Sequence, residues 1–308
     1  MAGETRRIAA YDDALHAENP EDLRTGECGY KYRLLDGLVV PPYVTPGRYA
    51  HARAFEMRPD DVCYVSYPKS GSTWLAHIIF LILHDGESPA EGTLRSQLHW
   101  LESSWTYPRS PDDLEQLPSP RIFKSHMPYR MALGGGPDRS RGRFIYIARN
   151  PKDVAVSYYH FERAKAWSGH YDGSWAHWLE MLTNGRVQRG DWFDHVLGWW
   201  NSRQLGNLLF LKYEDLLRDF PAQLRRLVGF LGVDPDERTL DKIEQLTRFD
   251  AMKTDRFANM HEIEDFEGFF REGRVGSWRD QFTAQQDAWF SQVIAERLAG
   301  SGLDFDYE

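Results

Sequence analysis

Cysteine is scarce in this chain, and long apolar stretches are missing. Only Cys28 and Cys63 occur among 308 residues, too few for a disulfide framework or a cysteine metal site. The longest apolar stretch, residues 74–83, is interrupted by His77 and is too short to span a bilayer, and the start of the chain lacks the apolar segment of a secretory signal. We therefore expect a soluble protein of the reducing cytoplasm, with no metal site and no membrane contact.

Positive charge is also in overall deficit. The 37 Lys and Arg residues against 46 Asp and Glu give a net charge of −9, which argues against a nucleic-acid-binding surface. Residues 121–152 are the exception, because they contain eight basic residues and a single acidic one, Asp138. This local excess indicates a small polyanionic ligand, although a solvated basic surface gives the same composition.

The order of apolar segments predicts the fold. No Pro/Ser-rich linker, repeat or low-complexity tract divides the chain, so we expect a single domain over residues 1–308. Short β-type segments at 62–67, 122–125, 144–147 and 208–211 alternate with longer segments of helical pattern. Helices are expected at 73–83, 151–165, 175–182, 192–201, 221–231, 239–246 and 283–299. The alternation predicts an α/β fold with a central, mainly parallel sheet and helices on both faces.

The segment VCYVSYPKSGSTWL at 62–75 is typical of a strand, a phosphate-binding loop and a helix. Lys69 supplies a cation, Gly71 lets the backbone approach an anion closely, and the following helix presents free N–H groups. Ser70, Ser72 and Thr73 add hydroxyl donors. An ordinary surface turn before a core helix is the alternative. The loop differs from that of nucleotide triphosphatases, because its Lys precedes its only Gly.

Three predicted strands end in residues suited to an anion. Lys69 follows the first, Lys124 and His126 end the second, and Arg149 follows the third. In a parallel α/β sheet, ligands bind beyond the carboxyl ends of the strands. We therefore expect these side chains to meet in one site.

Five motifs resemble those of the cytosolic sulfotransferases. They are YPKSGSTW at 67–74, PRIFKSHMP at 120–128, ARNPKDVAVSYYHF at 148–161, FLKYEDL at 210–216 and REGRVGSW at 271–278. The family transfers a sulfuryl group from 3′-phosphoadenosine 5′-phosphosulfate (PAPS) to a hydroxyl or amine and releases 3′-phosphoadenosine 5′-phosphate (PAP). The resemblance therefore implies PAPS as co-substrate, a small-molecule acceptor, in-line displacement and no metal.

The resemblance also implies roles in binding the nucleotide. Lys69, with Ser70, Gly71, Ser72 and Thr73, is expected at the 5′-phosphosulfate. Arg149, Ser157, Arg271 and Gly273 are expected at the 3′-phosphate. Trp74, Tyr213, Thr247 and Phe249 are expected at the adenine, with core packing as the alternative for Trp74. Glu272 stands where the family usually has Lys, and Ser277 where it has Asp, so Glu272 is expected to contribute only its backbone or to point away.

Catalysis is assigned to four residues, Lys69, Lys124, His126 and Ser157. His126 is the candidate general base, because an imidazole that titrates near neutrality can take the proton of an acceptor hydroxyl. Lys124 lies two residues earlier, so both side chains can point the same way from an extended backbone. His160 and His195 lack such neighbours and are interpreted as core or helix-surface residues.

The acceptor site is less marked. Trp100 and Glu102 fall where the family has an aromatic residue and a Glu, and Trp105 and Tyr107 extend an aromatic cluster suited to an apolar acceptor. Core packing would explain the same pattern. Two other functions stay open, a P-loop-type small-molecule kinase and a catalytically silent nucleotide-binding homologue.

The family's short C-terminal dimerisation segment is degenerate here. Its positions correspond to Arg279, Thr283, Ala284 and Ala288, so the Thr is kept while a Val and a Glu have become Ala. Losing the charged group and the apolar area weakens a small interface. We therefore expect a monomer, or a dimer through another surface.

Overall fold

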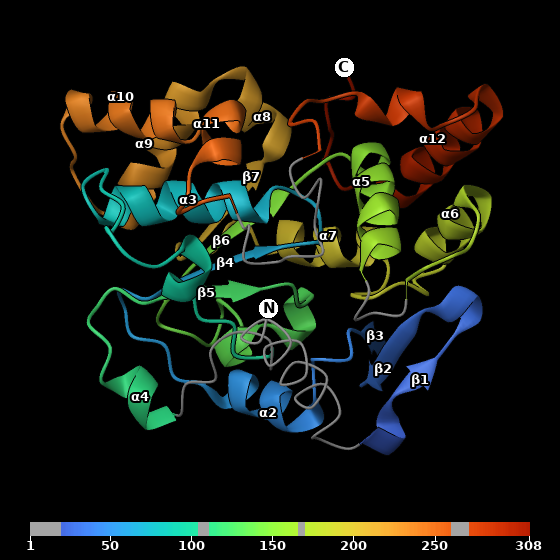
Figure 1. Cartoon of the computed structure of the whole chain (residues 1–308), viewed down its shortest axis with the longest axis horizontal. Coiled ribbons are helices and arrows are strands. Elements are labelled where there is room, and N and C mark those ends of the chain that lie inside the picture. The colour runs from blue at the N-terminus through green and yellow to red at the C-terminus, as the bar shows by residue number, and fades with distance from the viewer. Residues whose placement is uncertain (1–19, 104–110, 166–169, 260–270) are drawn as a thin grey trace, which may run out of the picture.

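A four-stranded parallel sheet forms the centre of the fold (Figure 1). The computed structural model describes residues 20–103, 111–165, 170–259 and 271–308. The strand order is β5-β4-β6-β7, and all three pairings are parallel. The strands are β4 (Val62–Ser66), β5 (Ile122–Ser125), β6 (Arg143–Ala148) and β7 (Leu208–Lys212). The predicted α/β class is confirmed, and each predicted strand lies within one residue of an observed one.

Alternate residues of the strands face opposite sides of the sheet and build two separate cores. On one side lie Cys63, Val65, Phe123, Phe144 and Tyr146. On the other side lie Val62, Tyr64, Ile122, Ile145 and Ile147. Both faces are therefore buried, which explains why the strands read as continuous apolar segments in the sequence.

Helices cover both faces, as expected. The second core includes residues of α3 (Ser72–Leu83), α8 (Tyr213–Arg218), α9 (Phe220–Leu231) and α10 (Glu237–Leu246), and α11 (Phe249–Thr254) follows on the same side (Figure 1). The first core includes residues of α2 (Pro46–Ala54), α4 (Pro111–Glu115), α5 (Pro151–Ala164), α6 (Trp175–Thr183), α7 (Trp192–Asn201) and α12 (Ala284–Leu298).

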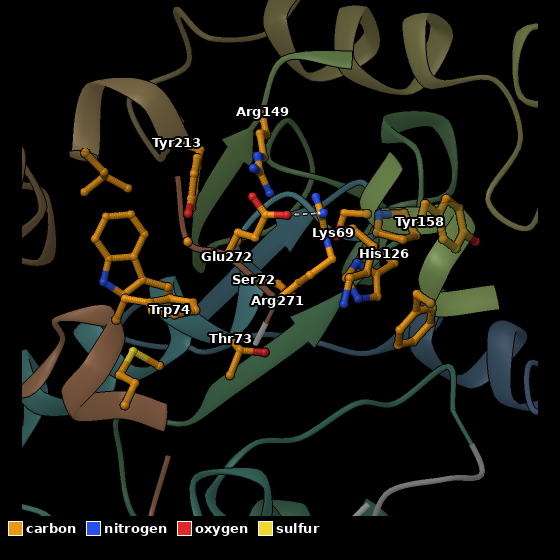
Figure 2. Close-up of a pocket in the computed structure, with 18 of the residues that line it drawn as sticks. Lys69, Ser72, Thr73, Trp74, His126, Arg149, Tyr158, Tyr213, Arg271 and Glu272 are labelled. Atoms are coloured by element: carbon orange, nitrogen blue, oxygen red, sulfur yellow. Dashed lines mark hydrogen bonds and ion pairs between the residues drawn. The ribbon is translucent and has the colours of Figure 1, made fainter. Parts of the chain in front are cut away.

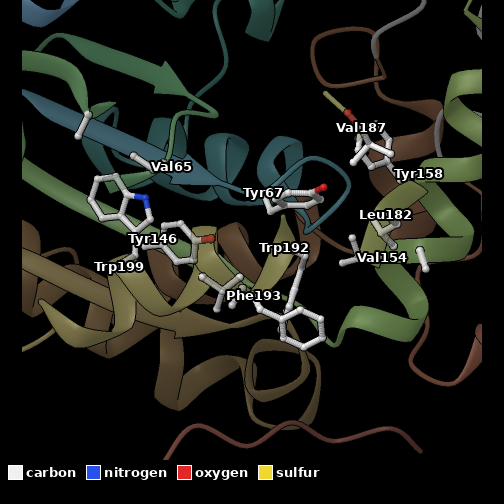
Figure 3. Close-up of a cluster of buried hydrophobic side chains, with 14 of the residues drawn as sticks. Val65, Tyr67, Tyr146, Val154, Tyr158, Leu182, Val187, Trp192, Phe193 and Trp199 are labelled. Atoms are coloured by element: carbon white, nitrogen blue, oxygen red, sulfur yellow. The ribbon is translucent and has the colours of Figure 1, made fainter. Parts of the chain in front are cut away.

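The first core is rich in aromatic rings (Figure 3). Tyr146 of β6 stacks with Trp199 of α7 at 5.4 Å and with Phe210 of β7 at 5.1 Å, measured between ring centroids. Tyr67, the residue after β4, is buried here and donates a hydrogen bond to the carbonyl oxygen of Gly190 at 2.9 Å. The core thus fixes the start of the predicted phosphate loop.

Three short antiparallel strands precede the main sheet and were not predicted. They are β1 (Arg24–Thr25), β2 (Lys31–Leu35) and β3 (Leu38–Val40). Asp36 and Gly37 join β2 to β3 with φ angles of 48° and 76°, the left-handed geometry of a tight hairpin turn. β2 and β3 pack with Tyr43, Trp100 and Met127 into a third, smaller cluster. The N-terminal hairpin therefore supports the position of Trp100.

Side chains of the expected type cap several of the helices. Asn150 accepts a hydrogen bond from the backbone N–H of Asp153 at the start of α5, and Thr283 accepts one from Gln286 at the start of α12. Both cysteines are free thiols. Across the described ranges, none of the helices combines the length and the apolarity that crossing a membrane requires.

Candidate active site

A cavity of about 360 Å³ opens at the carboxyl edge of the parallel sheet (Figure 2). It brings together most of the predicted site residues, while Ser70 and Glu102 do not line it and Trp105 and Tyr107 lie outside the described residues. Those that line it are Lys69, Gly71, Ser72, Thr73, Trp74, Trp100, Lys124, His126, Arg149, Ser157, Tyr213, Thr247, Phe249, Arg271, Glu272 and Gly273. The roles expected of them remain predictions, but their convergence from distant parts of the chain is a property of the fold.

The loop after β4 has the geometry of an anion cradle. Lys69 and Gly71 adopt φ angles of 66° and 96°, and a Cβ atom on Gly71 would lie 2.7 Å from a ring carbon of Tyr213. Gly71 precedes α3 without a side-chain cap, so the first N–H groups of that helix are open to an anion. Ser70 is fully buried, and its hydroxyl makes no hydrogen bond within the described residues.

Burial and neighbouring positive charges lower the pKa values of two lysines. The pKa of Lys69 falls to about 7, first because of burial and then because Arg149 and Lys124 lie near. The pKa of Lys124 also falls to about 7, through burial and the charge of Arg95. Lys69 Nζ lies 4.3 Å from the ring centroid of Phe161, and Lys124 Nζ lies 4.2 Å from that of Trp100. A bound polyanion would restore both charges.

His126 follows β5 and is held as a neutral imidazole. Its Nδ1 lies 2.8 Å from the carbonyl oxygen of Ser66, so Nδ1 carries the proton that it donates there and Nε2 is left as a proton acceptor. Burial, followed by the charges of Lys124 and Arg189, lowers the pKa of the ring well below its usual value. The arrangement suits a base that accepts a proton only as a reaction proceeds.

His195 of α7 supports the backbone of His126. It is 1% exposed, and its Nε2 lies 3.0 Å from the carbonyl oxygen of His126. Its Nδ1 lies 2.9 Å from the hydroxyl of Tyr146, and burial lowers its pKa to about 3. His195 is therefore a buried core histidine, as predicted, and also a positioning residue. His160 lies exposed on α5.

Arg149 and the C-terminal loop meet at Asp153, which the sequence reasoning missed. Asp153 is fully buried at the start of α5 and accepts hydrogen bonds from Ser277 Oγ at 3.1 Å and from the N–H of Trp278 at 2.9 Å. It also forms an ion pair with Arg149 Nη2 at 3.2 Å. Arg149 Nη2 donates to the carbonyl oxygen of Arg274 at 2.9 Å, which leaves its buried Nε without a partner among the described residues.

The side chain of Glu272 lies in the cavity instead of pointing away. Its carboxylate pairs with Arg271 Nη1 and, at 2.8 Å, with Arg274 Nε; Figure 2 shows the first contact as a dashed line. Arg271 Nη2 donates to Ser277 Oγ at 2.8 Å. The carboxylate thus occupies part of the guanidinium surface that an anionic ligand would need.

Aromatic rings and one glycine shape the end of the cavity at Trp74. Trp74 packs edge-on against Tyr213 at 5.3 Å and stacks on Phe220 at 5.9 Å, while a Cβ atom on Gly273 would lie 2.2 Å from Phe249. The hydroxyl of Thr247 donates to the carbonyl oxygen of Ile243 at 2.8 Å. Thr247 would therefore contact a ligand mainly by van der Waals packing and not by donating a hydrogen bond.

The opposite end of the cavity has an aromatic lining that continues beyond the predicted residues. Trp100 meets His126 edge-on at 5.5 Å. Tyr158 and Phe161 line it as well, and both lie in the motif at 148–161 without an expected role. The further lining residues there, which belong to no motif, are Tyr43, Lys165, Gln188 and Arg189. Trp105 and Tyr107 lie outside the described residues.

Glu102 lies behind this wall rather than in it. Its Oε1 accepts hydrogen bonds from Ser125 Oγ at 2.8 Å and from the N–H of His126 at 3.2 Å. Glu102 therefore orients the strand end that carries His126. No group of three or more His, Cys, Asp or Glu side chains suited to a metal ion occurs in the described part of the chain.

Known proteins resemble the chain over most of its length. The family model described as sulfotransferase domain matches residues 59–302. Human sulfotransferase 1C2 is 33% identical over 297 residues, which cover 92% of this chain and 99% of that protein. Human sulfotransferase 4A1 is 35% identical, with 94% and 98% covered. The structure of mouse sulfotransferase SULT7A1 complexed with PAP matches with a TM-score of 0.74 at 30% identity, over 88% of this chain and 95% of that one.

Proposed function

The chain belongs to the sulfotransferase domain family, and on that premise we propose that it moves the sulfuryl group of PAPS onto a hydroxyl or amine of a small-molecule acceptor by in-line displacement, with His126 as general base. The observation that carries the proposal is the meeting of Lys69, Lys124 and Arg149 from three strand ends around the neutral imidazole of His126. We also propose that the chain forms one sulfotransferase domain.

The residues present fit the nucleotide. Arg149 Nε, Arg271 Nε and Ser70 Oγ are buried without hydrogen-bond partners in the described ranges, and buried donors of this kind call for an anionic partner. Gly71 and Gly273 leave room where a Cβ atom would meet an aromatic ring. Lys69 and the start of α3 would hold the 5′-phosphate, and Arg149, Ser157 and Arg271 would hold the 3′-phosphate.

PAPS, when bound, supplies the sulfuryl group and a phosphate as leaving group. Lys69 would offset charge on that phosphate, and Lys124 would face the sulfuryl oxygens or orient the acceptor. His126 Nε2 would take the proton of the acceptor hydroxyl. Because Ser66 and His195 hold the ring and the backbone of His126, the base would need little reorganisation.

Labelled PAPS tests this proposal against a panel of phenols, alcohols and amines. We expect transfer of label to at least one class, and we expect His126→Ala to lower turnover by about a hundredfold or more. PAP affinity of His126→Ala, measured by calorimetry, should stay near that of the wild type. His84→Ala, at an exposed position at the end of α3 and away from the cavity, is the matched control. Full turnover in His126→Ala on an unactivated alcohol would show that another group is the base.

A further inference from the structure

The end of the cavity away from Trp74 holds a cation that the proposed reaction does not use. Figure 2 shows His126 and Tyr158 there, across the cavity from Trp74 and Tyr213. Arg189 lines the same cavity, yet its side chain is 1% exposed. It comes from the segment between α6 and α7, and no expected motif includes it.

The backbone of Arg189 is held firmly in an unusual conformation. Its φ angle is 76°, a left-handed geometry that costs a residue with a side chain about 1–2 kcal/mol. Its N–H donates to the carbonyl oxygen of Val39 at 2.7 Å. Tyr158 and Tyr67 donate to the carbonyl oxygens of Gln188 and Gly190, each at 2.9 Å. Strain of this kind, maintained by surrounding contacts, is characteristic of functional positions.

Among the described residues, no carboxylate forms an ion pair with the guanidinium of Arg189. Its Nη1 contacts the sulfur of Met127 at 3.2 Å, and its buried Nη2 makes no hydrogen bond to the described residues. Tyr43 lies beside it, but burial raises the pKa of that hydroxyl to about 12, so Tyr43 stays neutral. A buried charge without a counter-charge is costly.

Two carboxylates of the described residues lie near this end, and both already have partners. Glu162 forms a buried ion pair with Lys165, and Glu102 accepts hydrogen bonds from Ser125 and His126. Arg189 instead repels its neighbours, since its charge contributes to the lowered pKa values of Lys124 and Lys165. The charge that the described residues bring to the acceptor end is therefore positive, and it favours a ligand that carries a negative charge.

We propose that Arg189 determines acceptor specificity by binding a carboxylate on the acceptor, and that the acceptors are aromatic hydroxy acids. The guanidinium fork matches a carboxylate with two parallel hydrogen bonds. Tyr43, Trp100, Tyr158 and Phe161 line the same end and suit a flat ring. The hydroxyl of such a molecule would face His126 while its carboxylate reaches Arg189. The inference rests on the proposed sulfuryl transfer and names its substrate class.

A matched pair of probes tests the inference, namely para-hydroxyphenylpropanoate and its neutral carboxamide. Both carry the same phenol, so the comparison isolates the carboxylate. We expect PAP-loaded wild-type protein to bind the acid about tenfold to a hundredfold more tightly than the amide, and kcat/KM with PAPS to follow the same order. In Arg189→Met this ratio of acid to amide should fall toward one.

Two further variants complete the experiment. Arg189→Lys keeps the positive charge but loses the guanidinium fork, so it should retain part of the preference for the acid over the amide. It keeps the test decisive if Arg189→Met fails to fold. Arg203→Met removes an arginine that lies on Trp200, away from the cavity, and should leave the ratio unchanged.

The outcomes separate the inference from the proposed function. Equal binding of acid and amide, no binding of the acid to PAP-loaded protein, or an unchanged ratio in Arg189→Met with wild-type thermal stability would each overturn the role of Arg189. Failure of the wild type to bind PAP at all would instead overturn the proposed sulfuryl transfer. Binding of the acid that disappears in Arg189→Met supports the inference.

Discussion

Asp153 joins the start of α5 to the C-terminal loop by accepting a hydrogen bond from the N–H of Trp278 at 2.9 Å. The same carboxylate pairs with Arg149 at 3.2 Å. Because one buried side chain fixes both elements, the two sets of residues expected at the 3′-phosphate are held in a fixed relation before any ligand binds. A nucleotide would therefore meet a preorganised site.

Arg149→Ala should remove most of the selectivity for a 3′-phosphate. A charge-assisted hydrogen bond is worth about 1.5–3 kcal/mol, so wild-type protein should bind PAP about a hundredfold or more tightly than 5′-AMP if two such contacts form. Arg149→Ala should narrow that ratio by about tenfold or more. Calorimetry with both nucleotides measures it, and Arg203→Met serves as the control. Equal affinities of the wild type for PAP and 5′-AMP would refute the assignment of the 3′-phosphate site.

Glu272→Gln should strengthen PAP binding. The carboxylate pairs with Arg271 and Arg274 and competes with a phosphate for the same donors. Partly exposed ion pairs contribute up to about 1 kcal/mol, so we expect a gain of up to about fivefold. The dissociation constant for 5′-AMP should change less, because that nucleotide lacks the competing phosphate. A weaker PAP complex in Glu272→Gln would mean that the carboxylate assists binding.

PAP affinity should fall as the pH rises above 7. In the free protein the pKa values of Lys69 and Lys124 are about 7, and phosphates raise both toward the usual value. Binding above pH 7 therefore takes up protons, whereas near pH 6 the lysines are already charged. Each proton taken up weakens binding by about tenfold per pH unit over this window. Calorimetry at pH 7 and 9, in buffers of different ionisation enthalpy, measures affinity and proton uptake. A PAP affinity that stays constant between pH 7 and 9 would contradict this uptake of protons. In Lys69→Met the pH dependence of PAP affinity should be weaker.

Gly71→Ala should impair both stability and nucleotide binding. The residue has a φ angle of 96°, and the new Cβ atom would lie 2.7 Å from Tyr213. The backbone conformation alone costs about 1–2 kcal/mol. Gly229→Ala is the matched control, because it lies within α9 with nothing within 4 Å of the new methyl group, and it should stabilise the protein by about 0.5–1 kcal/mol. Thermal unfolding measures the stability and calorimetry measures PAP affinity. If Gly71→Ala matches the wild type in both, the loop after β4 is not the anion cradle described above.

The chain should be a monomer in solution, or dimerise elsewhere than at the start of α12. Thr283 there serves as the helix cap, accepting from the N–H of Gln286 at 3.2 Å, and Ala284 and Ala288 are exposed. Light scattering at micromolar concentration gives the mass. A dimer that dissociates on Thr283→Glu, with its helical content retained, would prove this prediction wrong.

Sequence reasoning succeeded where one pattern had one physical cause. The continuous apolar segments gave the four parallel strands, and the carboxyl-edge rule then placed Lys69, Lys124 and Arg149 in a single cavity. It missed the hairpin of β2 and β3, although Asp36-Gly37 between apolar residues was a usable turn signal.

The roles of three other residues could not be predicted from the sequence, because they depend on tertiary contacts. Asp153 looks like an ordinary residue of a first helical turn, and only tertiary structure shows that it holds the C-terminal loop. Arg189 sits in no motif, and its significance depends on burial and on the lack of a counter-charge among the described residues. The side-chain position of Glu272 likewise follows from two arginines that the loop brings beside it.

The gathering of Lys69, Lys124, Arg149, Lys165 and Arg271 around one cavity has a consequence for the lifetime of the protein. Like charges held together oppose the compact state, and an anionic nucleotide acts on them as a counter-ion. Nucleotide at a hundred times its dissociation constant adds about 2.7 kcal/mol to the stability of the fold. Since differences of this size change the abundance of a protein in cells, the amount of this enzyme should follow the supply of activated sulfate.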